Sequence, residues 1–93
     1  MELLNKIAII TGAGSGIGRA SSLKLANNGA KVVLVDFNKE SGEETLKLVK
    51  EQGGEGIFVQ ADVSKSEDVK RYVNEAVETF GRIDIFFNNA GII

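Results

Sequence analysis

The sequence contains neither cysteine nor histidine among its 93 residues. The absence of cysteine excludes disulfides, thiolate catalysis and zinc-ribbon sites, and without either residue type no transition-metal site is expected. The net charge of −2, from 11 basic and 13 acidic residues, leaves no basic surface for nucleic acid. The longest apolar runs, residues 7–10 and 32–35, are far shorter than the roughly 20 residues of a membrane helix. No signal-peptide pattern opens the chain. We therefore expect a soluble, cytoplasmic protein.

Short apolar runs alternate along the chain with segments of helical pattern. The runs predict strands at residues 6–11, 31–36, 56–61 and 83–88. The first, second and fourth runs lack strict alternation of polar and apolar residues, which is typical of strands covered on both faces. This order predicts an α/β fold, a Rossmann-like doubly wound parallel sheet with right-handed crossovers, here as its N-terminal β-α-β-α-β-α-β part.

Three helices are predicted between these strands, and each ends at a glycine. The first covers residues 18–28 and ends at Gly29. Capping-box patterns predict that the second begins at Ser41 and that the third follows Ser64; Gly53 and Gly81 end them. The third helix has apolar residues at the spacing of one buried face: Val69, Tyr72, Val73, Ala76, Val77 and Phe80.

The chain ends directly after the fourth predicted strand, with no helix to cover it. Phe86 and Phe87 would then lie on or near an open sheet edge, an arrangement that natural proteins avoid. We interpret residues 1–93 as the N-terminal part of a single, larger domain.

A glycine-rich loop joins the first predicted strand to the first predicted helix. Four glycines lie within the seven residues from 12 to 18. Glycines permit a tight turn and a close approach of the backbone to a ligand, and the helix N-terminus that follows suits a pyrophosphate. The loop therefore predicts phosphate binding through Gly12, Gly14, Ser15, Gly16, Ile17 and Gly18. No Gly-Lys-Ser/Thr follows, which excludes a Walker loop, and the spacing also departs from G-x-G-x-x-G.

Asp36 ends the second predicted strand, 24 residues after Gly12. In this architecture an acid at that place accepts hydrogen bonds from the adenosine ribose hydroxyls and repels a 2′-phosphate. Asp36 therefore favours NAD over NADP, although Arg19 and Lys39 are near in sequence. A solvated Asp at a strand end is the alternative.

The pattern Thr-Gly-x-x-x-Gly-x-Gly at residues 11–18, together with Asp62-Val63 and Asn88-Asn89-Ala90-Gly91, resembles the short-chain dehydrogenase/reductase family. The resemblance covers the whole chain but half or less of a family member. It implies that a nicotinamide cofactor lies across the carboxyl ends of the strands, with Gly12, Ser15 and Ile17 along the pyrophosphate and nearby ribose. It further implies that Asp62 and Val63 flank the adenine, and that Asn89, followed by Ala90 and Gly91, lies beside the nicotinamide-side ribose. Asn88 is expected to hold the sheet to Thr11.

The catalytic Tyr-x-x-x-Lys pair of that family is absent from this chain. The single tyrosine, Tyr72, is followed four residues later by Ala76, and its place on an apolar stripe predicts a core residue. No catalytic residue can be assigned, and the catalytic half is expected outside residues 1–93, so this chain alone should be inactive. A full-length member is expected to be a homo-oligomer acting on a small alcohol or carbonyl substrate.

Two alternatives remain open. One is an inactive nucleotide-binding or scaffolding module, which the presence or absence of a downstream Tyr-x-x-x-Lys would distinguish. The other is an S-adenosylmethionine-dependent methyltransferase. Thr11 argues against this class, because an acidic residue would be expected at that position.

Overall fold

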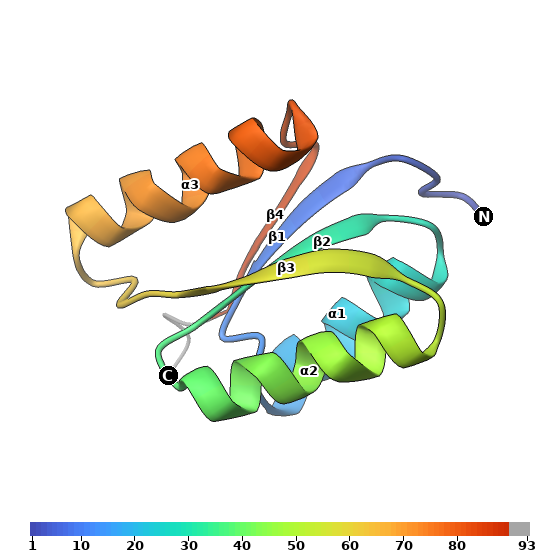
Figure 1. The fold of residues 1–93 in the computed structure, drawn as a ribbon, viewed down its shortest axis with the longest axis horizontal. Helices are drawn as coiled ribbons and strands as arrows, with labels where there is room; N and C mark the ends of the chain where they lie inside the picture. Colours follow the sequence, from blue (N-terminus) through green and yellow to red (C-terminus); the bar gives the residue numbers. More distant parts are fainter. Residues whose placement is uncertain (90–93) are drawn as a thin grey trace.

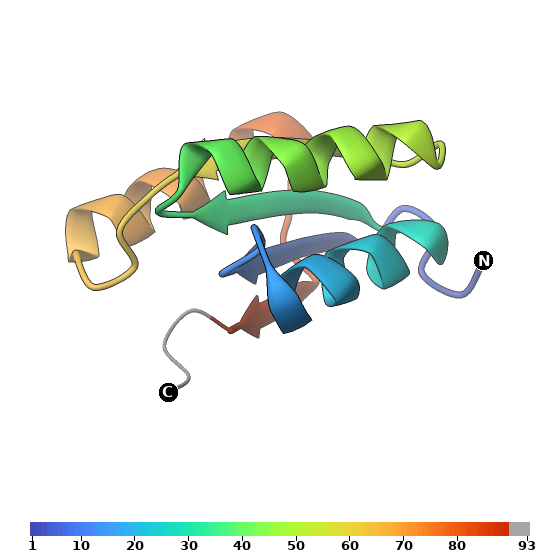
Figure 2. The ribbon, with the colours of Figure 1, turned by 90° about the horizontal axis from the view of Figure 1, so that it is seen from below.

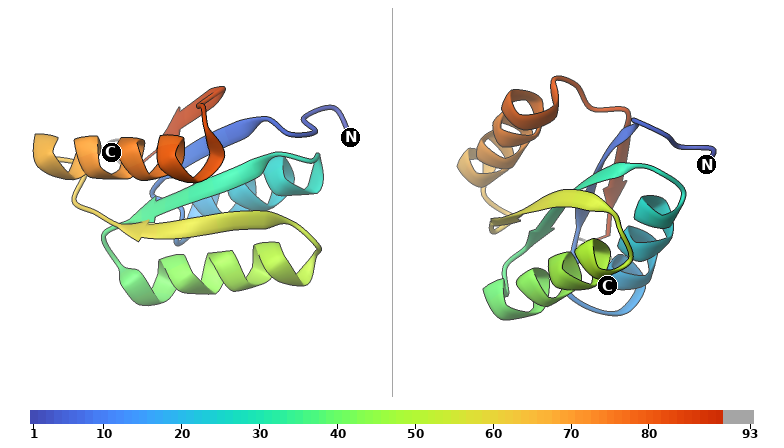
Figure 3. Two further views of the ribbon diagram at one scale, coloured as in Figure 1. Left: turned by 45° about the horizontal axis from the view of Figure 1, so that its top comes forward. Right: turned by 45° about the vertical axis from the view of Figure 1, so that its right-hand side comes forward.

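Seven elements alternate along residues 1–89, which are the residues that the computed structural model describes (Figure 1). They are β1 (Ile7–Thr11), α1 (Gly16–Asn27), β2 (Lys31–Asp36), α2 (Lys39–Glu51), β3 (Glu55–Gln60), α3 (Ser66–Phe80) and β4 (Ile85–Asn88). The strands form one parallel sheet in the order β3-β2-β1-β4. The views in Figure 3 show β4 and β2 on opposite sides of β1. The predicted order of elements and the parallel sheet are confirmed.

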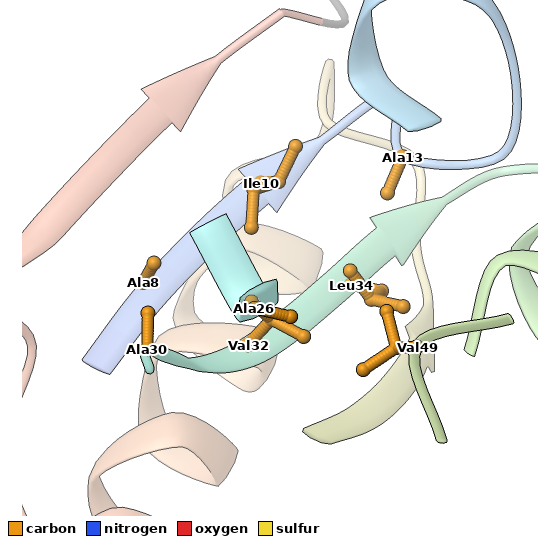
Figure 4. Packing of buried hydrophobic residues seen from close by; sticks show 8 residues of the cluster. All are labelled: Ala8, Ile10, Ala13, Ala26, Ala30, Val32, Leu34 and Val49. Atoms are coloured by element: carbon orange, nitrogen blue, oxygen red, sulfur yellow. The ribbon is translucent and has the colours of Figure 1, made fainter. Parts of the chain in front are cut away.

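Helices cover both faces of this sheet. Helices α1 and α2 lie against one face and α3 against the other (Figures 1 and 2). The core under α1 and α2 is built from small and branched side chains of the two central strands, such as Ile10 and Leu34, together with Ala26 and Val49 of the helices (Figure 4). The core under α3 contains Ile9. Because β1 is buried at every position and β2 at its four inner positions, the two central strands are covered on both faces as predicted.

The helix ends follow the predicted glycines, whereas the helix starts differ from the prediction. Gly29, Gly53 and Gly81 each adopt a positive φ, between 88° and 100°, just after α1, α2 and α3. This is the left-handed conformation that glycine adopts at no steric cost.

The two predicted capping boxes are wrong, and α1 begins two residues earlier than predicted. Helix α2 is capped by Asn38, whose side-chain oxygen accepts a hydrogen bond from the Ser41 amide at 3.0 Å, so Ser41 lies within the first turn. The Ser64 hydroxyl donates a hydrogen bond to the Asp62 carboxylate at 2.6 Å, and α3 starts at residue 66 without a side-chain cap. At α2, Asn38 thus provides the cap that the pattern assigned to Ser41. At α3, the Ser64 hydroxyl is bonded to Asp62, and no side chain caps the helix.

Strand β4 is shorter than predicted and lies at the edge of the sheet. It begins at Ile85. Just before it, the Asp84 N–H donates to the Ile7 carbonyl at 2.8 Å, and the Asp84 carboxylate accepts from the Ile7 amide at 2.8 Å. Phe87 packs against the core under α1 and α2, whereas Phe86 on the other face is 47% exposed. Within residues 1–89 the strand pairs with β1 alone, so the expectation that Phe86 and Phe87 lie on or near an open sheet edge is confirmed. The positions of β4 alternate between half-buried and exposed, so the prediction that it is covered on both faces is wrong for this part of the chain.

On α3, Tyr72 and Ala76 are buried as predicted, but Val77 at the margin of the same face is 45% exposed. Val77 does not belong to the residues that pack against the core under α3. Assigning Val77 to the buried face is therefore wrong for this part of the chain.

Candidate functional site

The candidate site lies at the edge of the sheet where the parallel strands end. From β1 the chain proceeds to β2 and β3 on one side, and after α3 it returns to the other side of β1 as β4. This reversal makes the end of β1 the switch point of the sheet, which is where ligands bind in open α/β folds. The loop at residues 12–15, the residues after β2 and β3, and Asn89 meet there.

The glycine loop after β1 has a backbone course that side chains would block. Gly12 and Gly16 have φ values of 66° and 54°. A Cβ atom on Gly18 would overlap the Gly12 carbonyl oxygen, and one on Gly14 would lie 2.7 Å from the Cβ of Ser41 and 2.8 Å from the Asp36 carboxylate. Gly16 differs from these, because a Cβ there would meet nothing within 4 Å. The loop therefore packs tightly on its inner side and is open at Gly16.

The N-terminus of α1 opens onto the same space. Ser15 occupies the N-cap position without a side-chain hydrogen bond, and no acidic residue lies in the first turn. Ser15 and Ile17 are exposed, Ile17 to 68%. The first amides of a helix lack partners within the helix and carry partial positive charge. This end of α1 therefore suits a phosphate group, and the glycines leave room for it.

Asp36, at the end of β2, faces the glycine loop. One of its carboxylate oxygens accepts a hydrogen bond from the Gly14 amide at 2.8 Å, and the other accepts from the Asn38 amide at 2.8 Å. Each carboxylate oxygen has a further lone pair for a ligand. Asp36 lines a pocket of about 280 Å³ together with Gly12, Phe37, Ala61, Asp62 and Val63. The structure thus brings together Gly12, Asp36 and Asp62-Val63, which the sequence analysis assigned to one cofactor.

Asp62 lies in the turn between β3 and α3. Its carboxylate accepts hydrogen bonds from the Ser64 hydroxyl at 2.6 Å and the Ser64 amide at 2.9 Å, and these two bonds lower the pKa of Asp62 below its ordinary value. The Asp62 amide donates to Asp68 at 2.7 Å. The carboxylate is therefore negatively charged at neutral pH and fixed in place at the pocket.

The ends of β1 and β4 are joined by side chains. The Thr11 hydroxyl donates to the Asn88 side-chain oxygen at 2.9 Å and accepts from the Asn89 amide at 2.9 Å. The expectation that Asn88 holds the sheet to Thr11 is confirmed. The Asn89 side chain lies 3.5 Å from the Gly12 carbonyl oxygen, which places it beside the glycine loop. The predicted site residues Ala90 and Gly91 lie outside the described residues.

Arg19 is bound to α2. Its guanidinium donates to the Thr45 hydroxyl at 2.9 Å and to the Ser41 carbonyl at 3.2 Å, and it pairs with Glu44 at 2.8 Å. Sequence reasoning missed Thr45, because a lone threonine within a helix carries no motif. Phe37 was not predicted as a site residue either. It is 72% exposed and lines the pocket, and its position next to Asp36 in the sequence could have indicated this.

Tyr72 is a core residue, as predicted. It is 2% exposed, its ring centre lies 6.2 Å from that of Phe86 in an edge-to-face arrangement, and burial raises the pKa of its hydroxyl. Nothing in this environment lowers the pKa of Tyr72 to the range of an acid/base catalyst.

Over residues 1–89, no three acidic side chains gather as metal ligands. None of the helices in this part of the chain has the length and apolar character needed to cross a bilayer.

A family model described as short chain dehydrogenase matches residues 6–93. The chain therefore belongs to the short-chain dehydrogenase family.

Individual relatives agree with this assignment. An uncharacterized oxidoreductase of Thermotoga maritima is 48% identical over 93 residues, covering 100% of this chain and 36% of the relative. The short-chain dehydrogenase/reductase homolog YusS of Bacillus subtilis is 45% identical over 94 residues, covering 99% of this chain and 85% of YusS. Among solved structures, an NAD⁺-bound xylitol dehydrogenase superposes with a TM-score of 0.95 at 39% identity, covering 99% of this chain and 35% of that one. The chain thus spans about a third of the length of most of the relatives described here, YusS being the exception.

Proposed function

We propose that residues 1–93 are the cofactor-binding part of an NAD-dependent oxidoreductase that transfers hydride between the nicotinamide and a small alcohol or carbonyl substrate. The observation that carries this proposal is the position of Asp36, which lies between the glycine loop and the pocket that contains Asp62. Family membership and the similarity to an NAD⁺-bound xylitol dehydrogenase support a nicotinamide cofactor.

The residues at the site fit the parts of a dinucleotide. The α1 N-terminus and the open side of Gly16 would receive the pyrophosphate, with Ser15, Ile17 and Gly18 around it. Asp36 would accept hydrogen bonds from the adenosine ribose hydroxyls. Asp62 and Val63 would hold the adenine, the carboxylate accepting from its exocyclic amine. Asn89, next to Gly12, would lie toward the nicotinamide-side ribose, followed by Ala90 and Gly91.

The preference for NAD over NADP rests on charge. The Asp36 carboxylate would repel a 2′-phosphate, and Arg19, a nearby cation, is paired with Glu44 and held by α2. Lys39 is exposed at the start of α2 and does not line the pocket. The nicotinamide supplies the hydride chemistry when bound, while the residues described here bind and orient the cofactor.

We further propose that the substrate-binding and acid/base residues lie in sequence beyond residue 93, in a cytoplasmic homo-oligomer. The chain contains no Tyr-x-x-x-Lys, and its one tyrosine is buried. The other two interpretations, an inactive nucleotide-binding module and a methyltransferase, are not favoured by the relatives, which are described as oxidoreductases or dehydrogenases.

The test is a calorimetric titration of NAD and NADP into the longest natural polypeptide that contains residues 1–93, called the natural polypeptide below. We expect NAD to bind more tightly than NADP. Tighter binding of NADP would overturn the cofactor assignment, and binding of neither would overturn the proposed function. A parallel titration with S-adenosylmethionine, expected to show no heat of binding, tests the methyltransferase alternative.

A further inference from the structure

One peptide group of the glycine loop is held at both of its ends by side chains. The Ala13 carbonyl oxygen accepts a hydrogen bond from the Thr45 hydroxyl at 2.8 Å. The Gly14 N–H, which belongs to the same peptide group, donates to Asp36 at 2.8 Å. Because a peptide group is planar, fixing its oxygen and its N–H fixes the orientation of the whole plane.

The direction of the Thr45 hydroxyl follows from its neighbours. Arginine has only donors, so the hydrogen bond from the Arg19 Nε at 2.9 Å requires Thr45 to accept. The single hydroxyl proton is then left for a carbonyl. The Ala13 oxygen at 2.8 Å is closer than the Ser41 oxygen at 3.3 Å, so the proton is directed to Ala13.

Burial makes this arrangement rigid. Thr45 and Ala13 are both 0% exposed, so water cannot replace the hydroxyl. Arg19 is fixed in turn by Glu44 at 2.8 Å and by the Ser41 carbonyl at 3.2 Å. The chain of contacts therefore runs from the surface ion pair through Arg19 and Thr45 to the loop.

We propose that Thr45, oriented by Arg19, is a positioning residue for the cofactor: it sets the Ala13–Gly14 peptide so that the Gly14 N–H points to Asp36. This inference rests on the proposed function, because it places Thr45 behind the ribose end of the dinucleotide site. The loop is then already in its binding conformation before the cofactor arrives. Without the Thr45 hydroxyl the Ala13 oxygen would be buried without its donor, and the peptide would be free to turn away from Asp36.

The experiment compares three variants of the natural polypeptide. Thr45→Val removes the hydroxyl but keeps the shape of the side chain, and Thr45→Ser keeps the hydroxyl. Thr79→Val makes the same change as the first variant on the exposed surface of α3. Two quantities are measured for each: the hydrogen-exchange rate of the Gly14 amide without cofactor, by NMR, and the dissociation constant for NAD.

For Thr45→Val we expect faster exchange at Gly14 and an NAD dissociation constant raised about five- to tenfold, the effect of losing roughly one buried hydrogen bond. Thr45→Ser restores both values to near those of the wild type, and Thr79→Val leaves both unchanged. The amides in the middle of β1 and β2 keep their wild-type exchange in all three variants, because the change is local to the loop.

A wild-type exchange rate at the Gly14 amide in folded Thr45→Val would overturn the proposal. An increase in exchange rate that is equally large at the amides of β1 and β2 would also overturn it, because such an increase reports a loss of global stability alone. If Thr45→Val does not fold, the same measurements are made on Arg19→Lys. This variant keeps the positive charge opposite Glu44 but changes the group that donates to Thr45. An unchanged exchange rate at the Gly14 amide would again overturn the proposal. The exchange arm needs no cofactor. A wild type that binds no NAD would therefore refute the proposed function, while the exchange data still decide the role of Thr45.

Discussion

Replacing Gly16 with alanine separates the requirements of cofactor binding from those of the fold. Gly16 has a φ of 54° and a Cβ there would meet nothing within 4 Å. Gly53, after α2, provides a matched control, since its φ is 88° and a Cβ there also meets nothing within 4 Å. Both substitutions force an L-residue into the left-handed region, which costs about 1–2 kcal/mol in the free energy of unfolding. Neither creates a clash within the described residues.

The two variants should differ in cofactor affinity. In the proposed site the pyrophosphate approaches the backbone at Gly16, so a methyl group there holds the ligand away from the α1 amides. Loss of even one charge-assisted hydrogen bond, worth about 1.5–3 kcal/mol, weakens binding roughly tenfold or more. We expect Gly16→Ala to lose NAD affinity by at least this factor, whereas Gly53→Ala keeps the wild-type dissociation constant.

The assay is calorimetric titration of NAD into both variants, with urea unfolding to confirm that their stability costs are similar. Equal NAD affinities in the two folded variants would show that the cofactor does not lie at the open side of Gly16. A Gly16→Ala protein that is far less stable than Gly53→Ala would also contradict the prediction, because the backbone geometry gives both substitutions a comparable cost.

Asp36→Ala should narrow the difference between NAD and NADP dissociation constants, because it removes the charge that repels a 2′-phosphate; an unchanged ratio would assign selectivity to another residue. Asp84 has its pKa lowered, first by the hydrogen bond from the Ile7 amide and then by Arg82. A depressed folded-state pKa means that its stabilisation is present above the ordinary aspartate value of about 3.9 and is lost as pH falls toward the lower folded value. Melting temperatures from pH 7 to pH 3 should therefore fall less steeply in Asp84→Asn than in the wild type, and parallel curves would contradict this. Residues 1–93 expressed alone should self-associate through the edge strand β4 and transfer no hydride; size-exclusion chromatography and an NAD-reduction assay check both, and a monodisperse, cooperatively melting monomer would contradict the first.

The fold could be predicted from the sequence because its signals are local. Apolar runs such as residues 32–35 predict buried strands, and Gly29, Gly53 and Gly81 end the helices where expected. The helix starts were less predictable. Serine, asparagine and aspartate all cap helices, and the sequence does not tell which of several nearby side chains reaches the free amide, as Asn38 does in place of Ser41.

The candidate site was predictable where a motif marks it and not where side chains meet across elements. Gly12, Asp36 and Asp62 carry signals in their spacing and adjoin one pocket. The contact of Thr45 with the Ala13 carbonyl joins residues 32 positions apart, and the pairing of Arg19 with Glu44 depends on how α1 packs against α2. Neither contact has a local pattern, because each depends on tertiary packing.

The most direct test of the central claim, that the glycine loop, Asp36 and Asp62 form a single dinucleotide site, is a crystal structure of the natural polypeptide with NAD. We expect the adenosine ribose hydroxyls within hydrogen-bond distance of Asp36, the adenine in the pocket beside Asp62 and the pyrophosphate at the α1 N-terminus. A bound cofactor that leaves Asp36 without contact, or that lies away from the carboxyl ends of the strands, would contradict it.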